Sequence, residues 1–350
     1  MKKFGWPIFT IFLISFILFI FFFNFFQKRN VLGTPKIVLM GKKIVTINLG
    51  ENYKEFGYKA FDTKDGNITG KVKILNEINS NKEGTYEIIY SVKNSDGILA
   101  KNNRFVKVIS TPYYKDSYDK IDNTTRGWWA TNKKDGSRPL GGADINELKK
   151  YNTFYMGPNK KIIYLTFDEG ALETYVKEIV AVLDKNDVKA TFFLCHTYMI
   201  SNKDLIKNMV KSGHLIGNHT VNHQSMPSLA NRDKFNDYLF EIKKMEDSYF
   251  KIVGKNMEKI YRDPRGEWSF RDLQIMKDLG YKNYFYSAYY MDFENDVSKD
   301  YALNELLSRI HNGAIYLIHP KNKGNLEAMD DFIKEVKKRG FIFDLVKNIH

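Results

Sequence analysis

The chain has 350 residues, which is long enough for two domains, one of them a large α/β unit. It carries 54 Lys and Arg residues against 41 Asp and Glu residues, a formal net charge of +13. The basic residues are spread thinly, with no Arg-rich cluster or aromatic-spaced basic stripe, so the pattern excludes nucleic acid as a partner and leaves a lysine bias with some attraction to anionic surfaces such as membrane or cell wall.

The first predicted element is a hydrophobic N-terminal segment. After Lys2 and Lys3, residues 4–26 contain no charged side chain, and "QKR" follows. This length is enough to cross a bilayer as a helix, and the small residues that would mark cleavage of a signal peptide are absent after it. We therefore predict an uncleaved transmembrane signal anchor at residues 1–30. Positive residues flank both of its ends, so charge alone does not settle the orientation.

Residues 35–110 are predicted to form a small all-β domain. The stretches "KIVLMGKKIVTINLG", "KVKILNE", "GTYEIIYSVKN" and "NRFVKVIS" alternate apolar and polar positions, and "NSDG" indicates a turn before the last strand. Short strands at this spacing favour a sandwich. Through "GENYKEFGYKAFDTKDGNITGKV" and "GTYEIIYSVKNSDG" the segment also resembles bacterial immunoglobulin-like modules of surface proteins. That resemblance implies an extracellular spacer or glycan-contacting module and assigns no chemistry.

The remainder is predicted to be an α/β catalytic domain over residues 151–350, preceded by a polar linker and lead-in at 111–150 that contains "GWWATNKKDGSRPLGG". From residue 161 onward, strand and helix patterns alternate. The helical stretch "ETYVKEIVAVLDKN" places four apolar residues on one face, Val176, Ile179, Val180 and Leu183. Such alternation predicts a parallel sheet, either open or closed into a barrel, and periodicity does not choose between the two.

Two neighbouring acids end the apolar run in "IYLTFDEG". Taken alone, Asp168 and Glu169 at the tip of a strand would be solvated loop residues. The preceding run is nearly continuous and apolar, as in a buried parallel strand. In α/β folds, chemistry takes place at the carboxyl ends of such strands, so both acids are candidate site residues.

Imidazole, guanidinium and further acid side chains follow other predicted strands. In "GNHTVNH", His219 and His223 are four residues apart, a spacing that lets two imidazoles share one metal ion. Further candidates come from "YRDPRG", "YMDF" and "YLIHP", namely Arg262, Arg265, Asp292 and His319. Each of these motifs alone is weak evidence for a functional site, but their occurrence at successive strand ends is together strong evidence for one. His214 is interpreted as structural, and the single cysteine, Cys195, as a buried inert thiol.

The order "TFDEG", "HTVNH", "RDPRG", "MDF", "LIH" resembles the polysaccharide deacetylase (NodB homology) family across roughly residues 150–346. "GWW" and "KYNTFYMGPNKKIIYLTFDEG" look like the branch that deacetylates N-acetylmuramic acid in peptidoglycan. The family fold implies a distorted (β/α) barrel here. It implies Asp168 as general base, Arg262 as the residue that orients it, His319 as general acid and Asp292 as the residue that tunes His319.

The resemblance also implies a divalent metal ion, most simply Zn²⁺, with His219 and His223 as ligands. Glu169 stands where the family has a second aspartate, so it is a further candidate ligand. Arg265 and Gly266 are expected to bind substrate, with a backbone N–H near Arg265 helping to hold the oxyanion. This chain departs from the branch at Asp263, where proline is usual, and at Phe293, where tryptophan is usual.

The expected function is metal-dependent removal of acetyl groups from N-acetylmuramic acid in peptidoglycan glycan strands, as for muramic δ-lactam formation in spore cortex. The catalytic domain is then expected outside the cell membrane or facing the spore cortex. The alternatives are an N-acetylglucosamine deacetylase, an inactive glycan-binding relative, and a membrane-anchored adhesin in which the β domain acts. Retention of both base and acid argues against an inactive binder.

Overall fold

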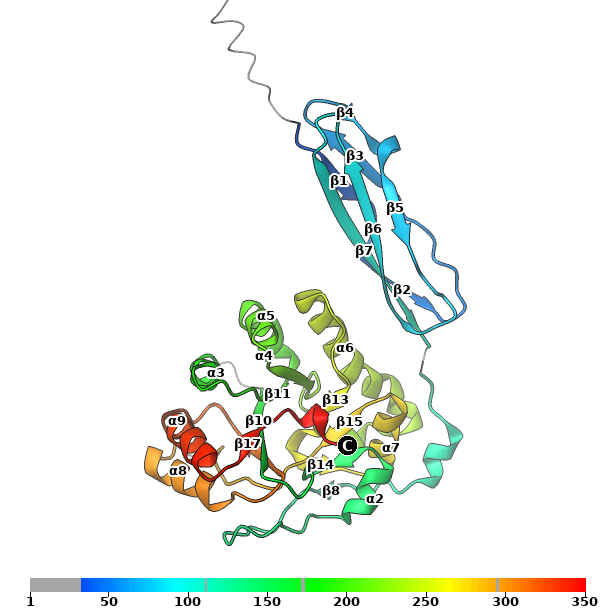
Figure 1. The fold of residues 1–350 in the computed structure, drawn as a ribbon. Helices are drawn as coiled ribbons and strands as arrows, with labels where there is room; N and C mark the ends of the chain where they lie inside the picture. The colour runs from blue at the N-terminus through cyan, green and yellow to red at the C-terminus, as the bar shows by residue number, and fades with distance from the viewer. Residues whose placement is uncertain (1–32, 111, 171–173, 294–295) are drawn as a thin grey trace, which may run out of the picture. The chain divides into compact units, whose positions relative to one another are not determined.

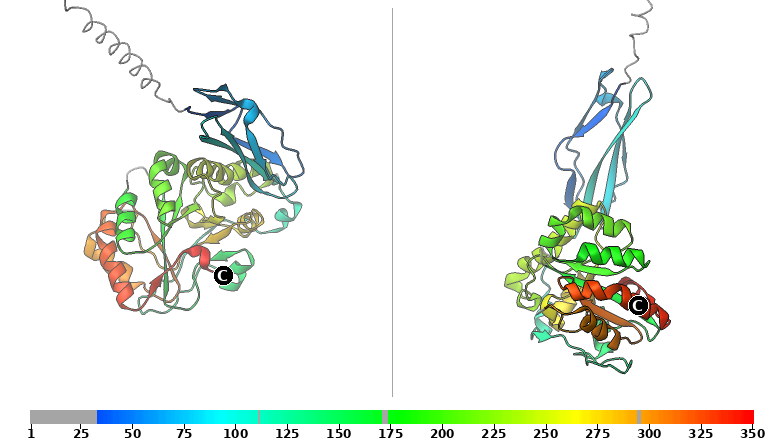
Figure 2. Two further views of the ribbon diagram at one scale, coloured as in Figure 1. Left: turned by 45° about the horizontal axis from the view of Figure 1, so that its top comes forward. Right: turned by 90° about the vertical axis from the view of Figure 1, so that its left-hand side faces the viewer.

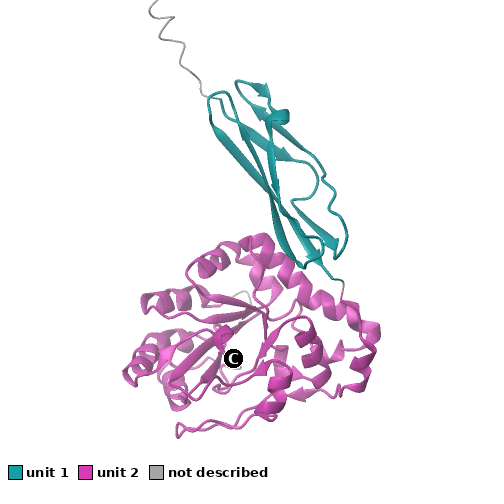
Figure 3. Ribbon diagram, turned by 45° about the vertical axis from the view of Figure 1, so that its right-hand side comes forward, with its two compact units in different colours: residues 1–111 teal, residues 112–350 magenta. Residues whose placement is uncertain are grey.

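The structure, a computed structural model, describes residues 33–110, 112–170, 174–293 and 296–350. The chain forms two compact units, residues 1–111 and residues 112–350 (Figure 3). The transmembrane helix predicted at residues 1–30 lies outside the described residues. Within the described ranges, no helix is both long enough and apolar enough to cross a bilayer.

The first unit is a sandwich of two β-sheets, as the alternating pattern predicted. One sheet has the order β1-β3-β4 and the other the order β2-β7-β6-β5. Strands β2 and β7 run parallel, whereas β1–β3, β3–β4, β5–β6 and β6–β7 pair antiparallel. Inward side chains such as Ile37, Ile88 and Val106 form its core. The strands are β1 (Lys36–Leu39), β2 (Ile44–Asn48), β3 (Tyr58–Asp62), β4 (Gly66–Asn67), β5 (Lys73–Asn76), β6 (Gly84–Lys93) and β7 (Leu99–Ile109).

The structure refines the predicted strands of this unit in two places. Gly97 adopts a φ of 81° and donates its N–H to the Asn94 carbonyl at 3.1 Å, so "NSDG" forms the predicted turn between β6 and β7. The alternating stretch "KIVLMGKKIVTINLG" forms two strands, divided at Gly41, whose φ is 73°. That left-handed residue lets β1 and β2 belong to different sheets.

The second unit is built on an eight-stranded sheet with the order β16-β10-β11-β12-β13-β15-β9, in which β17 also pairs with β10. Neighbouring strands in this sheet run parallel. Strand β16 lies at one edge of this sheet. Two bridges, a parallel one from Ala288 to Tyr316 and an antiparallel one from Met156 to Ala314, join the opposite edge of the sheet to β16. The sheet therefore curves round on itself as a distorted (β/α) barrel. Its strands are β9 (Thr153–Phe154), β10 (Ile162–Glu169), β11 (Thr191–Leu194), β12 (Leu215–Asn218), β13 (Ile260–Tyr261), β15 (Lys282–Tyr284), β16 (Ala314–Ile318) and β17 (Ile342–Phe343).

Helices cover the outside of these strands, as Figures 1 and 2 show for α3, α5, α6 and α9. The four apolar residues predicted on one face of α3 are all buried. Their contacts with the sheet make the main core of the unit. The helices are α2 (Ile145–Lys150), α3 (Val176–Lys185), α4 (His196–Ser201), α5 (Lys203–Lys211), α6 (Phe235–Val253), α7 (Phe270–Asp278), α8 (Lys299–Ser308) and α9 (Lys323–Lys338).

The lead-in segment belongs to the second unit and supports its strand ends. Strand β8 (Arg126–Gly127) pairs antiparallel with β14 (Glu267–Trp268). Next to it, Trp128 stacks on Phe285 with ring centroids 4.3 Å apart. Its indole N–H donates to the Tyr286 carbonyl at 2.9 Å, and its backbone N–H donates to the Gly266 carbonyl at 2.7 Å. The "GWW" stretch thus braces the loops that follow β13 and β15.

Candidate functional site

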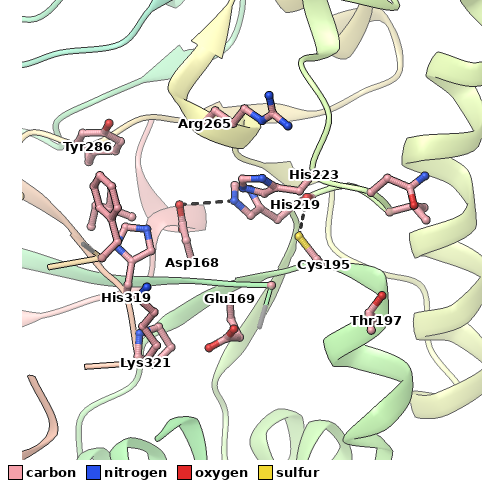
Figure 4. A pocket seen from close by; sticks show the side chains of 16 residues that line it. Asp168, Glu169, Cys195, Thr197, His219, His223, Arg265, Tyr286, His319 and Lys321 are labelled. Atoms are coloured by element: carbon pink, nitrogen blue, oxygen red, sulfur yellow. Dashed lines mark hydrogen bonds and ion pairs between the residues drawn. The ribbon is translucent and has the colours of Figure 1, made fainter. Parts of the chain in front are cut away.

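A cavity of about 910 Å³ lies at the carboxyl ends of the parallel strands (Figure 4). Asp168 is the last residue but one of β10, His219 follows β12, and His319 follows β16. Parallel strands present their carboxyl ends at one edge of a sheet, and for this reason residues far apart in the sequence meet here. The predicted site residues that line the cavity are Asp168, Glu169, His219, His223, Arg265 and His319.

Asp168 is buried and forms an ion pair with Arg262, whose Nη1 lies 2.7 Å from its Oδ1. Burial raises the pKa of the Asp168 carboxyl, but the charge of Arg262, with smaller contributions from His219 and His319, outweighs burial and holds the pKa below its usual value. Asp168 is therefore a carboxylate near neutral pH, which is the form that can accept a proton.

Arg262 is itself held rigidly beneath the cavity. Its Nε donates to the Tyr284 carbonyl at 2.7 Å, and its Nη2 donates to the Phe285 carbonyl at 3.3 Å. The guanidinium also lies over the ring of Phe193, 4.3 Å from the ring centre. These contacts fix the direction from which Arg262 approaches Asp168.

The two histidines lie in a tight loop after β12. Left-handed backbone at Thr220 (φ 69°) and His223 (φ 55°) folds this loop, and the two imidazole centroids are 5.0 Å apart. Glu241 of α6 accepts the N–H groups of Val221 and Asn222, each at 2.8 Å, and so secures the loop. The two imidazoles are therefore brought together by a tight loop and not by one turn of a helix.

Both imidazoles are in the neutral form that binds metal. His219 Nδ1 lies 2.9 Å from the Arg262 carbonyl, so it carries the proton, and its Nε2 lies 3.7 Å from Asp168 Oδ2 with a free lone pair. Burial lowers the pKa of His219. Burial, together with the neighbouring His219, lowers the pKa of His223 to about 4.

The donor set suits a divalent ion, although no three His, Cys, Asp or Glu side chains of the described residues are already arranged as ligands. Two neutral imidazoles beside a carboxylate are the ligands of a hydrolytic Zn²⁺ site. The carboxylate nearest the imidazoles is that of Asp168, whose Oδ2 lies 3.7 Å from His219 Nε2, but its assigned role is that of the base and not of a ligand. Figure 4 shows Glu169 on the opposite side of β10, because successive side chains of a strand point to opposite faces. The structure therefore does not bring the candidate ligand Glu169 to the histidines.

His319 is paired with Asp292 on the other side of the cavity. Its Nδ1 lies 2.6 Å from Asp292 Oδ1, and its backbone N–H donates to Oδ2 of the same residue at 2.7 Å. Burial lowers the pKa of His319, but the hydrogen bond and charge of Asp292 outweigh it, so the pKa is raised above its usual value. His319 therefore stays protonated to higher pH, with Nε2 as the nitrogen left for a leaving group.

Arg265 and Gly266 differ in their relation to the cavity. Arg265 is exposed and lines the cavity on the side of the two imidazoles (Figure 4). Its φ of 61° is left-handed, a conformation that costs a non-glycine residue about 1–3 kcal/mol. Gly266, in contrast, is not among the lining residues. Its N–H donates to the Asp263 carbonyl at 3.3 Å.

Several residues of the site were not anticipated from the sequence. Asn325 of α9 donates to Asp292 Oδ2 at 2.8 Å, and no sequence pattern marked it. Glu241 did leave a signal, because it is an acid on the apolar stripe of α6, where a lone charge needs a partner. Tyr286 lines the cavity after β15. Cys195 is buried, and burial raises the pKa of its thiol to about 12, in agreement with an inert role.

Comparison with known proteins places this site in a family. A model described as polysaccharide deacetylase matches residues 156–284, and one described as a bacterial surface protein Ig-like domain matches residues 37–108. An uncharacterised 30.6 kDa protein of Geobacillus stearothermophilus is 38% identical over 227 residues, 64% of this chain and 84% of that protein. The chain belongs to the polysaccharide deacetylase family.

A second relative has a name that states its activity. The peptidoglycan-N-acetylmuramic acid deacetylase PdaA of Bacillus subtilis is 34% identical over 233 residues, 65% of this chain and 87% of that protein. The solved structure of PdaA, a family 4 carbohydrate esterase, superposes with a TM-score of 0.62 at 33% identity and covers 65% of this chain and 98% of that one. The chain is accordingly a carbohydrate deacetylase with an N-terminal Ig-like domain.

The ligand assignment predicts which substitutions remove the metal. His219→Ala or His223→Ala should abolish most binding of Zn²⁺, because one remaining imidazole makes a poor site. Asp168→Asn should keep the ion yet lower kcat by about 10²- to 10⁴-fold, the usual contribution of a general base. Glu169→Gln should change ion binding little. Equilibrium dialysis with elemental analysis measures the bound Zn²⁺ in each variant. If Glu169→Gln lost as much ion as the histidine variants, Glu169 would be a ligand.

The His319–Asp292 pair predicts a shift in the pH profile. Asp292 raises the pKa of His319, so Asp292→Asn should lower it, and the acid would lose its proton at lower pH. The alkaline limb of kcat should therefore move to lower pH, while the acidic limb, set by Asp168, should stay in place. Initial rates across the pH range measure this shift, and an unmoved alkaline limb would contradict the assignment of His319 as the acid.

Proposed function

We propose that the protein hydrolyses the N-acetyl amide of N-acetylmuramic acid in peptidoglycan, as for muramic δ-lactam formation in spore cortex. The observation that carries this proposal is the arrangement of a carboxylate, two neutral imidazoles and a protonated imidazole around one cavity, with the Arg265 guanidinium at its rim. PdaA, whose name states this activity, is similar to the chain over most of its own length. Similarity to that relative supports the sugar assignment.

Each residue of the site has a separate role in the proposed amide hydrolysis. His219 and His223 would hold a divalent ion, most simply Zn²⁺, which when bound polarises the acetyl carbonyl and makes water more nucleophilic. Asp168 takes a proton from the attacking water, and Arg262 keeps it ionised and oriented. His319 gives a proton to the departing sugar amine from Nε2, while Asp292 holds its other nitrogen. The base is thus kept unprotonated and the acid protonated by different buried partners.

Selectivity for muramic acid rests on Arg265. Both N-acetyl sugars of peptidoglycan carry the same amide, and only muramic acid bears a lactyl ether with a carboxylate. The Arg265 guanidinium at the rim can pair with that carboxylate through two parallel hydrogen bonds, a contact that glucosamine cannot offer. A stem peptide would convert the carboxylate to an amide. The preferred substrate is therefore muramic acid without a stem peptide.

Glycan strands from which an amidase has removed the peptides provide the test. The full chain should remove acetyl groups from muramic acid, as read by mass spectrometry of the fragments. Arg265→Gln should lower kcat/KM on these strands by about tenfold, the low end for a charged hydrogen bond at an exposed site, and should leave activity on chitin oligomers unchanged. Deacetylation of glucosamine alone, or equal use of chitin oligomers by the wild type, would contradict the muramic acid assignment.

We also propose that residues 1–30 anchor the chain in the cell membrane and that both units lie outside the cell or face the spore cortex. Support comes from the uncharged run in the sequence and from the match to Ig-like domains of bacterial surface proteins. Protease added to intact protoplasts should digest both units, as followed by immunoblot. Full protection until the membrane is permeabilised would reverse the orientation.

A further inference from the structure

Asp263 and Asp272 have no part in the proposed chemistry, yet they are buried next to one another. Asp263 lies in the arginine loop (residues 262–266), and Asp272 lies in the first turn of α7. Their exposed fractions are 1% and 0%, and the two carboxyl groups hydrogen-bond each other. Two carboxylates in contact in a buried site cannot both remain ionised. One proton must therefore lie between them.

The hydrogen bonds around the pair show where that proton is needed. Tyr261 donates its hydroxyl to Asp263 Oδ1 at 2.9 Å, and Asn283 donates its amide to Oδ2 at 2.7 Å. Tyr238 donates its hydroxyl to Asp272 Oδ1 at 2.5 Å. The remaining oxygen, Asp272 Oδ2, is buried and has no N–H or O–H donor in the described part of the chain. A proton on Asp263 supplies the missing donor.

No positive charge compensates the pair. The polar groups that face it are Tyr238 of α6, Tyr261 of β13 and Asn283 of β15, and each of them is uncharged near neutral pH. The neighbouring arginines turn elsewhere, Arg262 to Asp168 and Arg271 to Asn231 and backbone carbonyls. Within the described ranges, neither carboxyl forms an ion pair with Lys, Arg or His. Burial together with the partner carboxyl raises the pKa of Asp263 well above its usual value, and burial raises that of Asp272 to about 6.

We propose that Asp263 and Asp272 share one proton and that this singly protonated pair positions the arginine loop. The loop carries Arg262, which holds Asp168, and Arg265, which lines the cavity. In addition to the side-chain bonds of Arg262, two backbone carbonyls support the loop near its ends: that of Gly266 accepts from the Trp128 N–H, and that of Arg262 accepts from His219. Asp263 lies between those two supports in the sequence, so the carboxyl pair fastens the middle of the loop to α7. Both aspartates act as positioning residues.

The shared proton makes the stability of the second unit depend on pH. A carboxyl whose pKa is raised in the folded state takes up a proton on folding once the pH exceeds its pKa in the unfolded chain, which is about 4. Its favourable contribution is complete below that pH and is lost as the pH rises through the folded pKa. Over this range the unfolding equilibrium constant should rise by up to about tenfold per pH unit.

Asparagine at position 263 should remove this dependence. Its Nδ2 can donate to Asp272 Oδ2, as the shared proton does. The Asn283 amide can turn over so that its Oδ1, which has no partner among the described residues, accepts the second N–H. Asp263→Asn therefore mimics the protonated pair at every pH. Asp300→Asn, at an exposed carboxylate of α8, is the matched control.

The experiment is denaturant unfolding of the full chain from about pH 5 to about pH 9, followed by tryptophan fluorescence. Three of the four tryptophans, Trp128, Trp129 and Trp268, lie in the second unit, and residues 33–110 contain none. The fourth is Trp6, so Trp6→Phe is introduced into every variant and the signal then reports the second unit. The unfolding constant of the wild type relative to Asp263→Asn should rise with pH by up to about tenfold per unit, and Asp300→Asn should follow the wild type. Parallel curves for the wild type and Asp263→Asn would overturn the shared proton.

Two further measurements test the proposal, and each has an outcome that refutes it even if Asp263→Asn does not fold. The infrared C=O stretch of a protonated carboxylic acid should be present in the wild type at about pH 7 and absent in Asp272→Asn, where Asp263 gains an amide donor and ionises. Its absence from the wild type would refute the pair. For positioning, Asp263→Ala should lower kcat/KM by up to about 100-fold and Asp263→Asn should restore most of it. Unchanged activity in a folded Asp263→Ala would refute the positioning role.

Discussion

The geometry of the site depends on one buried guanidinium, that of Arg262. Its side chain donates to Asp168 and to the carbonyls of Tyr284 and Phe285, and its own carbonyl accepts from His219. This single residue therefore ties together the ends of β10, β13 and β15 and the loop after β12. A lysine could not take its place, because an ammonium lacks the planar fork that reaches a carboxylate and two carbonyls at once. Arg262 thus orients the base through its guanidinium and one proposed metal ligand, His219, through its backbone carbonyl.

Every other buried acid near the cavity is subject to the same constraint, namely that a charge removed from water needs partners. Asp292 accepts from the backbone and ring of His319 and from Asn325, and Glu241 accepts from the backbone of the histidine loop. Asp263 has no cationic partner in the described part of the chain, and the neighbouring carboxyl of Asp272 keeps it protonated instead. The partners come from different helices and strands, so the barrel must be complete before any of these side chains is fixed. That requirement makes the cavity rigid where catalysis needs fixed geometry.

Much of the architecture was predictable because it depends on near neighbours in the chain. Alternating side chains indicated the strands of the Ig-like unit, and the apolar face of α3 was predicted residue by residue. Failures occurred where the local signal was weak. The two-residue strands β9 and β13 and the six-residue helices α2 and α4 are too short to show a period. The division of β1 from β2 at Gly41 depends on which sheet each strand joins, and pattern alone does not contain that information.

For the site, the sequence by itself determined which chemical groups stand at the strand ends, since residue type and distance from an apolar run are local properties. It placed Asp168, the histidine pair, Arg262 and His319 correctly at those ends. Only the tertiary structure decided that Asp168, and not Glu169, faces the imidazoles, that Asn325 and Glu241 support the cavity, and that the sheet curves round to bring its other edge back to β16. These outcomes depend on packing between segments far apart in the sequence, where the need to satisfy buried charges selects the partner and periodicity carries no information.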